Sequence, residues 1–226
     1  MSTNKTAPKG KKIKEEESWL VTYGDMMTLL MTFFVLLFSI STIDQVKLEQ
    51  FSQSVQDAMD PNASVNTTYS LLDIYNEVTK VIEKGNLKDK IQVETSSRGV
   101  SIQIPSKISF GSGSAKLNPD IYSILNKFTK MMSQSIFSIG IEGHTDNVPT
   151  GSSGPYPSNW ELSSARASEV VKYYINNGVP SSRFQAIGYA DTKPRAEGKT
   201  IAEANSTPEK RMKNRRVEIS WLTMAK

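Results

Sequence analysis

The sequence contains no cysteine and a single histidine, His144, in 226 residues. The absence of cysteine excludes disulfides, thiolate metal sites and cysteine nucleophiles, and it leaves the redox compartment open. One histidine also argues against a metal site built from several histidines and against a multi-histidine active site. A chain of this length has room for one domain of ordinary size plus accessory segments.

Net charge is also low. The formal charge is +4, and residues 1–18 contribute half of it through five lysines and three glutamates. The rest of the chain therefore carries only +2. A basic face of the size that nucleic acids require does not follow from this balance, so we expect no nucleic-acid partner.

One long apolar run stands out against this polar background. The sequence from Trp19 to Ile43 carries one charge, that of Asp25, and about 20 helical residues are enough to span a bilayer. It predicts a transmembrane helix over 19–43. The lysines before it place the basic tail, residues 1–18, in the cytoplasm and the chain after the helix outside. A cleaved signal peptide with Ser39-Ile40-Ser41 as its processing site is the alternative, but the run is long for one.

An aspartate in such a helix costs insertion energy, about 2.5–3.5 kcal/mol at mid-bilayer, so it is a candidate functional residue. At about 100° per residue, Asp25, Thr28, Thr32 and Ser39 fall on one narrow stripe, and Thr22 flanks Asp25 on the other side. This stripe is expected to face another helix or a wet path. The alternative is that the hydroxyls bond back to their own helix and that Asp25 lies among the lipid headgroups.

The segments after the membrane change character twice. Residues 44–60 have the spacing of an amphipathic helix, with Leu48, Phe51 and Val55 on one face. Residues 61–88 are expected to form a polar, proline-broken linker followed by a helix over 70–84.

A folded domain is expected over 89–226. Period-two alternation and helix-cap signals predict an α/β (α+β) sandwich with helices on one face of a mixed sheet. Asn118 is expected to cap one helix, and Ser163 is expected to cap another that runs to about Asn177. The expected strands cover 91–94, 100–104, 138–142, 184–188 and 217–222.

Asp146 follows one of these strands and Arg166 lies near a helix start. A carboxylate and a guanidinium brought together beside a helix N-terminus would suit a zwitterionic ligand. An ordinary surface salt bridge between them is the alternative. A hydrolase built from His144, Asp146 and Ser163 is disfavoured, because the chain has no G-x-S-x-G elbow and no second histidine. We expect no enzymatic activity and no metal or organic cofactor, and we expect His144 to be a packed residue at a strand end.

Four segments in register resemble OmpA-like peptidoglycan-binding domains over roughly residues 90–222. They are Phe110–Leu117, Gly143–Asp146, Leu162–Ala167 and Asn214–Glu218. The resemblance implies that Asp146 and Arg166 clamp the diaminopimelate of a peptidoglycan stem. It also implies contributions from the neighbouring motif residues Thr145, Leu162, Asn214 and Arg216. The segment from Val148 to Ser158 is longer than in many members of the family.

The segment Trp19–Leu30, between a lysine-rich tail and such a domain, is similar to flagellar stator B subunits of the MotB/PomB type. The resemblance implies a homodimer of this chain inside a ring of four-pass A subunits of the MotA/PomA type. It implies that Asp25 is the ion-binding carboxylate, supported by Thr22, Thr28 and Thr32. Residues 44–60 would then be the plug that closes the channel.

The function implied is a stator subunit in the inner membrane that couples proton or sodium flow through Asp25 to torque. The chain would be anchored to peptidoglycan and would act on the flagellar rotor indirectly, through the A subunit. A B subunit of another ion-driven rotary complex and a passive cell-wall anchor are the alternatives. The run from Phe33 to Leu37, with Ser39, looks closer to sodium-type members. The coupling ion also depends on partner residues, so both ions stay open.

Overall fold

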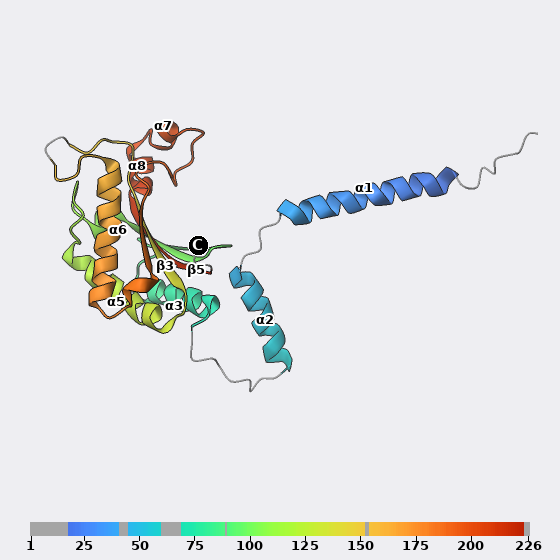
Figure 1. Cartoon of the computed structure of the whole chain (residues 1–226), viewed down its shortest axis with the longest axis horizontal. Helices are drawn as coiled ribbons and strands as arrows, with labels where there is room; N and C mark the ends of the chain where they lie inside the picture. The colour runs from blue at the N-terminus through green and yellow to red at the C-terminus, as the bar shows by residue number, and fades with distance from the viewer. Residues whose placement is uncertain (1–17, 41–44, 60–68, 89, 152–153, 224–226) are drawn as a thin grey trace, which may run out of the picture. The chain divides into compact units, whose positions relative to one another are not determined.

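The structure is a computed structural model that describes residues 18–40, 45–59, 69–88, 90–151 and 154–223. Two units make up the chain, Met1–Thr42 and Ile43–Lys226, and each is described by itself (Figure 1). The predicted basic tail (residues 1–17 of it) and most of the predicted linker, residues 61–68, lie outside the described residues.

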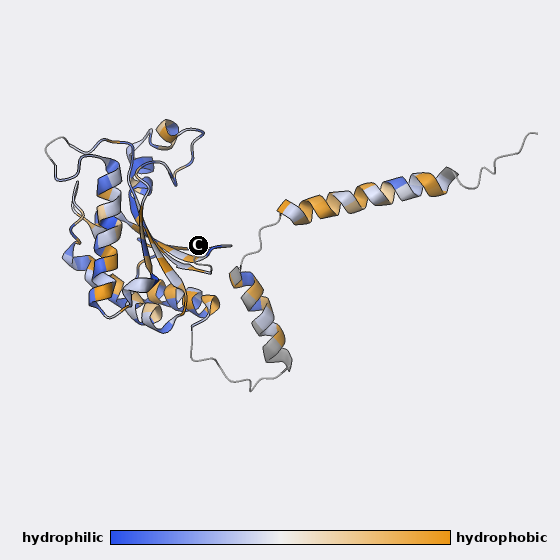
Figure 2. Cartoon of the chain, viewed as in Figure 1, coloured by the Kyte–Doolittle hydropathy of each residue, from blue (hydrophilic) through white to orange (hydrophobic). Residues whose placement is uncertain are grey.

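The first unit contains helix α1, Ser18–Ile40. Its residues Trp19–Ile40 have a mean hydropathy of 1.7, and none of this stretch is buried within the protein. Apolar residues predominate along the helix (Figure 2). Among the described residues it is the one helix long and apolar enough to cross a membrane. The last three residues of the predicted span, 41–43, fall outside the described part of the chain.

The second unit begins with two helices, α2 (Gln45–Met59) and α3 (Leu71–Lys84). Ser70 caps α3 through a reciprocal pair of hydrogen bonds with Asp73, which satisfies free amides at the helix start. The buried face of α3, which includes Leu71, Ile74 and Val78, belongs to the main hydrophobic core. The folded domain therefore extends further toward the N-terminus than the predicted boundary at residue 89.

Five strands form one sheet in the order β1-β2-β5-β3-β4. The β3–β4 pair is parallel and the other pairs are antiparallel, so the sheet is mixed, as predicted. The strands are β1 Gln92–Ser96, β2 Gly99–Pro105, β3 Ser138–His144, β4 Phe184–Gly188 and β5 Arg216–Leu222.

Helices α3, α5 and α6 lie on one face of this sheet, which confirms the predicted fold class (Figure 1). The other helices after β2 are short. The helices after β2 are α4 Ser106–Ser109, α5 Pro119–Gln134, α6 Asn159–Asn176, a 3₁₀ turn Ser181–Arg183, α7 Ile201–Ala204 and α8 Pro208–Asn214.

The two faces of the sheet differ in chemistry because side chains alternate along each strand. Residues such as Ile102, Ile141 and Trp221 point into the apolar core with the helices. The alternate positions of the three central strands form a polar face that is also buried. Its buried members are Gln103, Glu142, His144, Arg216, Glu218 and Ser220.

Helix α6 begins earlier than expected, and this prediction was wrong. Its N-cap is Ser158, whose hydroxyl accepts a hydrogen bond from the amide of Trp160, and not Ser163. Ser163 lies in the second turn and is fully buried. Its hydroxyl donates to the carbonyl of Trp160 and accepts from the amide of Ala190, so it ties the helix to the loop after β4.

The start of α5 is as predicted, with Pro119 in its first turn. The side chain of Asn118 does not cap it, however, and donates instead to the carbonyl of Ile108.

Two glycines let α6 lie directly on the sheet. A Cβ atom on Gly143 of β3 would lie 2.1 Å from the carbonyl oxygen of Ser163. A Cβ atom on Gly188 of β4 would lie 2.2 Å from the hydroxyl of Ser164. Both positions therefore require glycine for close backbone approach. The contact fixes the N-terminal half of α6 beside the end of β3, where the functional site is found.

Candidate functional site

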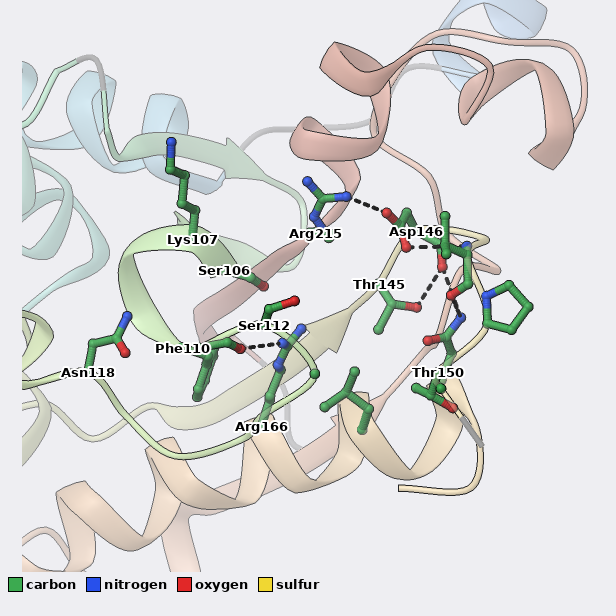
Figure 3. A pocket seen from close by; sticks show the side chains of 17 residues that line it. Ser106, Lys107, Phe110, Ser112, Asn118, Thr145, Asp146, Thr150, Arg166 and Arg215 are labelled. Atoms are coloured by element: carbon green, nitrogen blue, oxygen red, sulfur yellow. Dashed lines mark hydrogen bonds and ion pairs between the residues drawn. The ribbon is translucent and has the colours of Figure 1, made fainter. Parts of the chain in front are cut away.

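A cavity of about 710 Å³ opens where β3 ends and α6 begins (Figure 3). Its walls come from three stretches: the loop around α4, the segment after β3, and the first turns of α6. Arg215, directly before β5, completes the lining. The lining residues are Ser106, Lys107, Phe110, Gly111, Ser112, Gly113, Asn118, Thr145, Asp146, Val148, Pro149, Thr150, Gly151, Asn159, Leu162, Arg166 and Arg215.

Asp146 is held in place at this cavity by three contacts. Its side chain is 8 % exposed, and one carboxylate oxygen forms an ion pair with the guanidinium of Arg215. The other oxygen accepts a hydrogen bond from the amide of Val148, which closes a tight turn. The side-chain amide of Asn159 donates to the carbonyls of Asp146 and Val148 and so joins this turn to α6.

Arg166 enters from α6 and is 4 % exposed. Its Nε donates to the carbonyl of Ser114 over 2.9 Å, and its Nη2 donates to the carbonyl of Gly111 over 3.3 Å. The guanidinium also lies over the ring of Phe110, 5.1 Å from the centroid. These contacts fix the plane of the guanidinium at the cavity.

The charge of Arg166 is not balanced by a partner. No carboxylate among the described residues forms an ion pair with it, and Asp146 pairs with Arg215 instead, so a simple Asp146–Arg166 surface salt bridge is not what the structure contains. Burial, and after it the charge of Arg215, lowers the pKa of Arg166 to about 10, against the opposing effect of Asp146. The group stays cationic at neutral pH. A buried cation without a counter-charge is a strong attractor for an anionic ligand group.

The residues expected from sequence divide into two groups. Thr145 and Leu162 line the cavity together with Asp146 and Arg166. Asn214 and Arg216 do not. Asn214 is fully buried and supports the loops around it through hydrogen bonds to residues 195, 196, 204 and 205.

Arg216 points to the polar face of the sheet, where its Nε donates to Glu218 over 2.7 Å. Arg215, next to it in sequence, is the arginine that reaches the cavity. Adjacent residues at a strand start point to opposite sides, so knowledge of the strand register would have identified Arg215. The segment Val148–Gly151 is a second contributor that was not expected, and within it the buried hydroxyl of Thr150 has no hydrogen-bond partner in the described part of the chain.

His144 takes no part in this cavity. Its ring is buried and stacks on Tyr189, with 5.3 Å between ring centroids. Burial lowers the pKa of His144, although the neighbouring Glu142 opposes this effect. The hydroxyl of Ser163 is bonded elsewhere, so the three residues of the disfavoured hydrolase do not form a triad.

One group of possible metal ligands lies on the polar face. Donor atoms of Glu142, His144 and Glu218 all lie within 4.8 Å of one another. Arg98 pairs with the first carboxylate and Arg216 with the second. Because both carboxylates already have cationic partners, the electrostatics of this cluster disfavour a divalent cation.

In α1, Asp25 is the one charged residue between Trp19 and Ile40. The neighbouring hydroxyls are bonded to their own helix. Thr28 donates to the carbonyl of Asp25 over 2.8 Å, and Thr32 donates to that of Thr28 over 2.6 Å. Thr22 donates to the carbonyl of Trp19. The hydroxyl oxygens of Thr28 and Thr32 keep acceptor capacity, because a hydroxyl carries one proton and two lone pairs.

Helix α2 exposes the three residues that the sequence had placed on one apolar face. Leu48 is 51 % exposed, Phe51 is 69 % exposed and Val55 is 41 % exposed. They follow the i, i+3, i+7 spacing of one helical face. An exposed apolar row of this kind is typical of a surface that binds a partner.

Comparison with known proteins gives two family matches. Residues 3–59 match the MotB plug family, described as membrane MotB of the proton-channel complex MotA/MotB. Residues 109–211 match the OmpA family.

Individual relatives match over most of their length. The chain is 36% identical to the uncharacterized protein YtxE of Bacillus subtilis over 93% of this chain and 90% of that protein. It is 29% identical to motility protein B of Bacillus subtilis over 90% of each. A solved structure of the cell wall anchor of the T6SS from Pseudomonas aeruginosa is similar with a TM-score of 0.57 and 28% identity, covering 65% of this chain and 97% of that one.

These matches extend over the apolar helix, the segment after it and the sheet domain with its cavity. Members of these families are structural and channel proteins rather than enzymes. The chain belongs to the MotB-like family of membrane-anchored proteins, with a MotB plug region followed by a C-terminal OmpA-family domain.

Proposed function

We propose that the chain is the B subunit of an ion-driven stator of the flagellar motor, anchored to peptidoglycan. The observation that carries this proposal is the single carboxylate of Asp25 in an otherwise uncharged apolar helix of membrane-spanning length. A passive anchor needs the helix but has no use for a carboxylate whose insertion costs free energy.

In this proposal a proton or sodium ion enters from outside and neutralises Asp25, and its release to the cytoplasm restores the charge. Each change alters how α1 contacts the surrounding four-pass A subunits. The hydroxyl groups of Thr22, Thr28 and Thr32 flank the site, and the oxygens of Thr28 and Thr32 can accept from or coordinate an ion. The driving force is the transmembrane field, about 2.3 kcal/mol per elementary charge per 100 mV.

The proposal includes the topology and assembly that such a cycle needs. The basic tail would lie in the cytoplasm and the sheet domain outside the inner membrane. Two copies of the chain would lie within a ring of A subunits, which transmits the motion to the rotor. The exposed row of Leu48, Phe51 and Val55 on α2 supports a plug that closes the ion path until the unit joins the motor.

The cavity at β3 and α6 would provide the anchor. A diaminopimelate side chain carries one ammonium and one carboxylate. The unbalanced guanidinium of Arg166 suits the carboxylate, while Asp146, oriented by Arg215, suits the ammonium. An anchor of this kind supplies the reaction force, because a torque generator that is not tied to the wall would itself turn.

Ion leakage tests the channel part. The full chain without residues 45–59 would be co-expressed with the four-pass partner from the same genome. We expect the cells to stop growing and the cytoplasm to acidify or take up sodium, because the unplugged path conducts. Adding Asp25→Asn to the deletion should restore growth. An unchanged leak in the double variant would reject Asp25 as the ion site. The matched control adds Thr79→Val, in α3, to the same deletion in place of Asp25→Asn.

Sedimentation with purified peptidoglycan tests the anchor. The full-length chain in detergent should co-sediment, and the double variant Asp146→Ala, Arg166→Ala should stay in the supernatant. The double variant Asp120→Ala, Lys127→Ala on exposed positions of α5 removes the same charges and should sediment normally. Equal sedimentation of both variants would reject the clamp.

A second candidate has support from one observation, the similarity to a T6SS cell wall anchor. In that case the chain would tie a different envelope complex to the wall, and the similarity to the uncharacterized protein YtxE is compatible with this. Motility separates the candidates. A strain lacking this chain should lose swimming if it is the flagellar stator and should swim normally if it serves another complex.

A further inference from the structure

A second cavity of about 930 Å³ lies between the β1–β2 edge of the sheet and helix α8, on the side away from the core helices. Gln103 and Arg216, both buried, belong to its lining, and more exposed side chains complete it. We call it the basic groove. Its lining residues are Lys90, Gln92, Gln103, Pro105, Lys107, Ile108, Arg195, Ala196, Glu197, Lys210, Met212, Lys213 and Arg216.

The basic groove carries an excess of positive charge, although the chain as a whole carries little. Six of its lining residues are lysine or arginine and one, Glu197, is acidic. Both arginines are neutralised, since Arg195 pairs with Glu94 and Arg216 pairs with Glu218. Counting these three carboxylates against the six cations still leaves an excess of three positive charges.

The excess resides on lysines. Lys90, Lys107 and Lys213 are exposed, and none of them forms an ion pair with a residue that the structure describes. The two paired arginines are fixed by neighbouring groups: Arg195 also donates to Gln92 over 3.0 Å, and Arg216 donates to the carbonyl of Asn214 over 3.1 Å. The groove thus has a rigid floor and a rim of available ammonium groups.

The basic groove lies next to the first cavity. Lys107 of α4 lines both. In the close view its side chain extends away from Arg166 and Thr145 (Figure 3). Wall material attached to a ligand in the first cavity would therefore lie near the lysines of the groove.

The composition of the groove narrows the chemistry of its ligand. No aromatic side chain is found among its described lining residues, so these offer no stacking surface of the kind that single-stranded nucleic acids require. Met212 is the one exposed large apolar residue of the lining, which gives little surface for insertion into a lipid layer. Separated lysine ammonium groups act as point charges and suit phosphate groups spaced along a flexible chain.

We propose that the basic groove binds a phosphodiester-bearing anionic polymer of the cell wall, beside the site that takes the peptide stem. This inference rests on the proposed wall-anchoring function of the same domain. It assigns the wall two contacts on one domain, a zwitterion at Asp146 and Arg166 and a polyanion along Lys90, Lys107 and Lys213.

The test uses the full chain in nanodiscs of zwitterionic lipid, with poly(glycerol phosphate) as the probe. Lys90→Glu with Lys213→Glu reverses two charges of the groove, and Lys127→Glu with Lys130→Glu makes the same change on exposed positions of α5. We expect the groove variant to bind the probe at least about tenfold more weakly at low ionic strength, with a flatter salt dependence, and the control to bind as the parent chain does.

Two further arms separate this inference from the anchor itself. Peptidoglycan treated with hydrofluoric acid, which removes phosphodiester-linked polymers, should bind the groove variant as well as the parent, whereas Arg166→Ala should lose this binding and keep the probe. The inference is overturned if groove and control variants weaken equally. It is also overturned if polyglutamate or vesicles with phosphatidylglycerol bind through the same lysines as tightly as the probe. Loss of wall binding by Arg166→Ala alone would leave the groove measurement intact, so the two failures are distinguishable.

Discussion

The contact between Gly143 and Ser163 makes a strong quantitative prediction, because α6 and its Arg166 are positioned by it. In Gly143→Ala the new Cβ atom would lie 2.1 Å from the carbonyl oxygen of Ser163 and 2.8 Å from its carbonyl carbon. Ordinary contact begins at 3.4 Å, so the helix must move by about 1.3 Å or the strand must distort. Neither neighbour is a flexible side chain.

Overpacking of a core typically costs about 1–3 kcal/mol of stability. A clash with backbone atoms should cost at least the upper value of this range, because the backbone cannot move aside as a side chain can. We therefore expect Gly143→Ala to lower the free energy of unfolding by about 3 kcal/mol or more. At about 2–4 °C per kcal/mol for a unit of this size, the unfolding midpoint should fall by about 6–12 °C. Binding to peptidoglycan should weaken as well, because the shift displaces Arg166 from its carbonyl partners.

Thermal unfolding of the full chain in detergent, followed by near-ultraviolet circular dichroism, measures the midpoint. Gly140→Ala is the matched control: it lies on the same strand, and its Cβ atom would lie 3.3 Å from the flexible end of Leu222. We expect that change to cost less than about 1 kcal/mol. Equal midpoints for the two variants would refute the close packing of α6 on β3.

Three further predictions concern the cavity and the polar face. Arg166→Lys keeps the charge but loses the planar fork that contacts two carbonyls, so peptidoglycan affinity in sedimentation should fall about tenfold or more; unchanged affinity would mean that charge alone suffices. Arg215→Gln frees Asp146 from its ion pair and should weaken the same affinity less than Arg166→Ala does; a larger loss would place Arg215 in direct contact with ligand. His144→Gln should flatten the pH dependence of stability. Burial lowers the pKa of His144 in the folded state, so as the pH falls the unfolded chain takes up a proton on this residue at a higher pH than the folded chain does. The parent therefore loses stability as the pH falls below about 6.5, and the variant does not have this contribution. Denaturant unfolding at several pH values checks this, and parallel pH profiles for parent and variant would contradict it.

The sequence predicted most of the fold, because period-two alternation in the strands and caps of the helices are local signals. Ser163 shows where local signals fail. A serine at a helix start is a good N-cap, but this one is recruited to a tertiary contact with Ala190, and Ser158 takes the capping position. Likewise, Asn118 has the residue type of a cap and uses its side chain to hold Ile108.

The candidate site was predicted in part. Asp146 and Arg166 reach one cavity because β3 ends beside the first turns of α6. Of the two consecutive arginines after Asn214, Arg215 faces the cavity and Arg216 does not. Which of them does so depends on the register of β5, and that register is set by pairing with β3. The contribution of Val148–Gly151 depends on a turn closed by Asp146, which no residue pattern specifies alone.

The most direct test of the central claim is the swimming speed of cells in which Asp25→Asn replaces the native residue. The variant should be present in the membrane at normal level and should co-sediment with peptidoglycan, because neither α1 insertion nor the cavity depends on the charge. The account predicts that these cells do not swim, whereas parent cells swim at a speed that follows either external sodium at fixed pH or the proton gradient. Swimming at normal speed with Asp25→Asn would contradict the account.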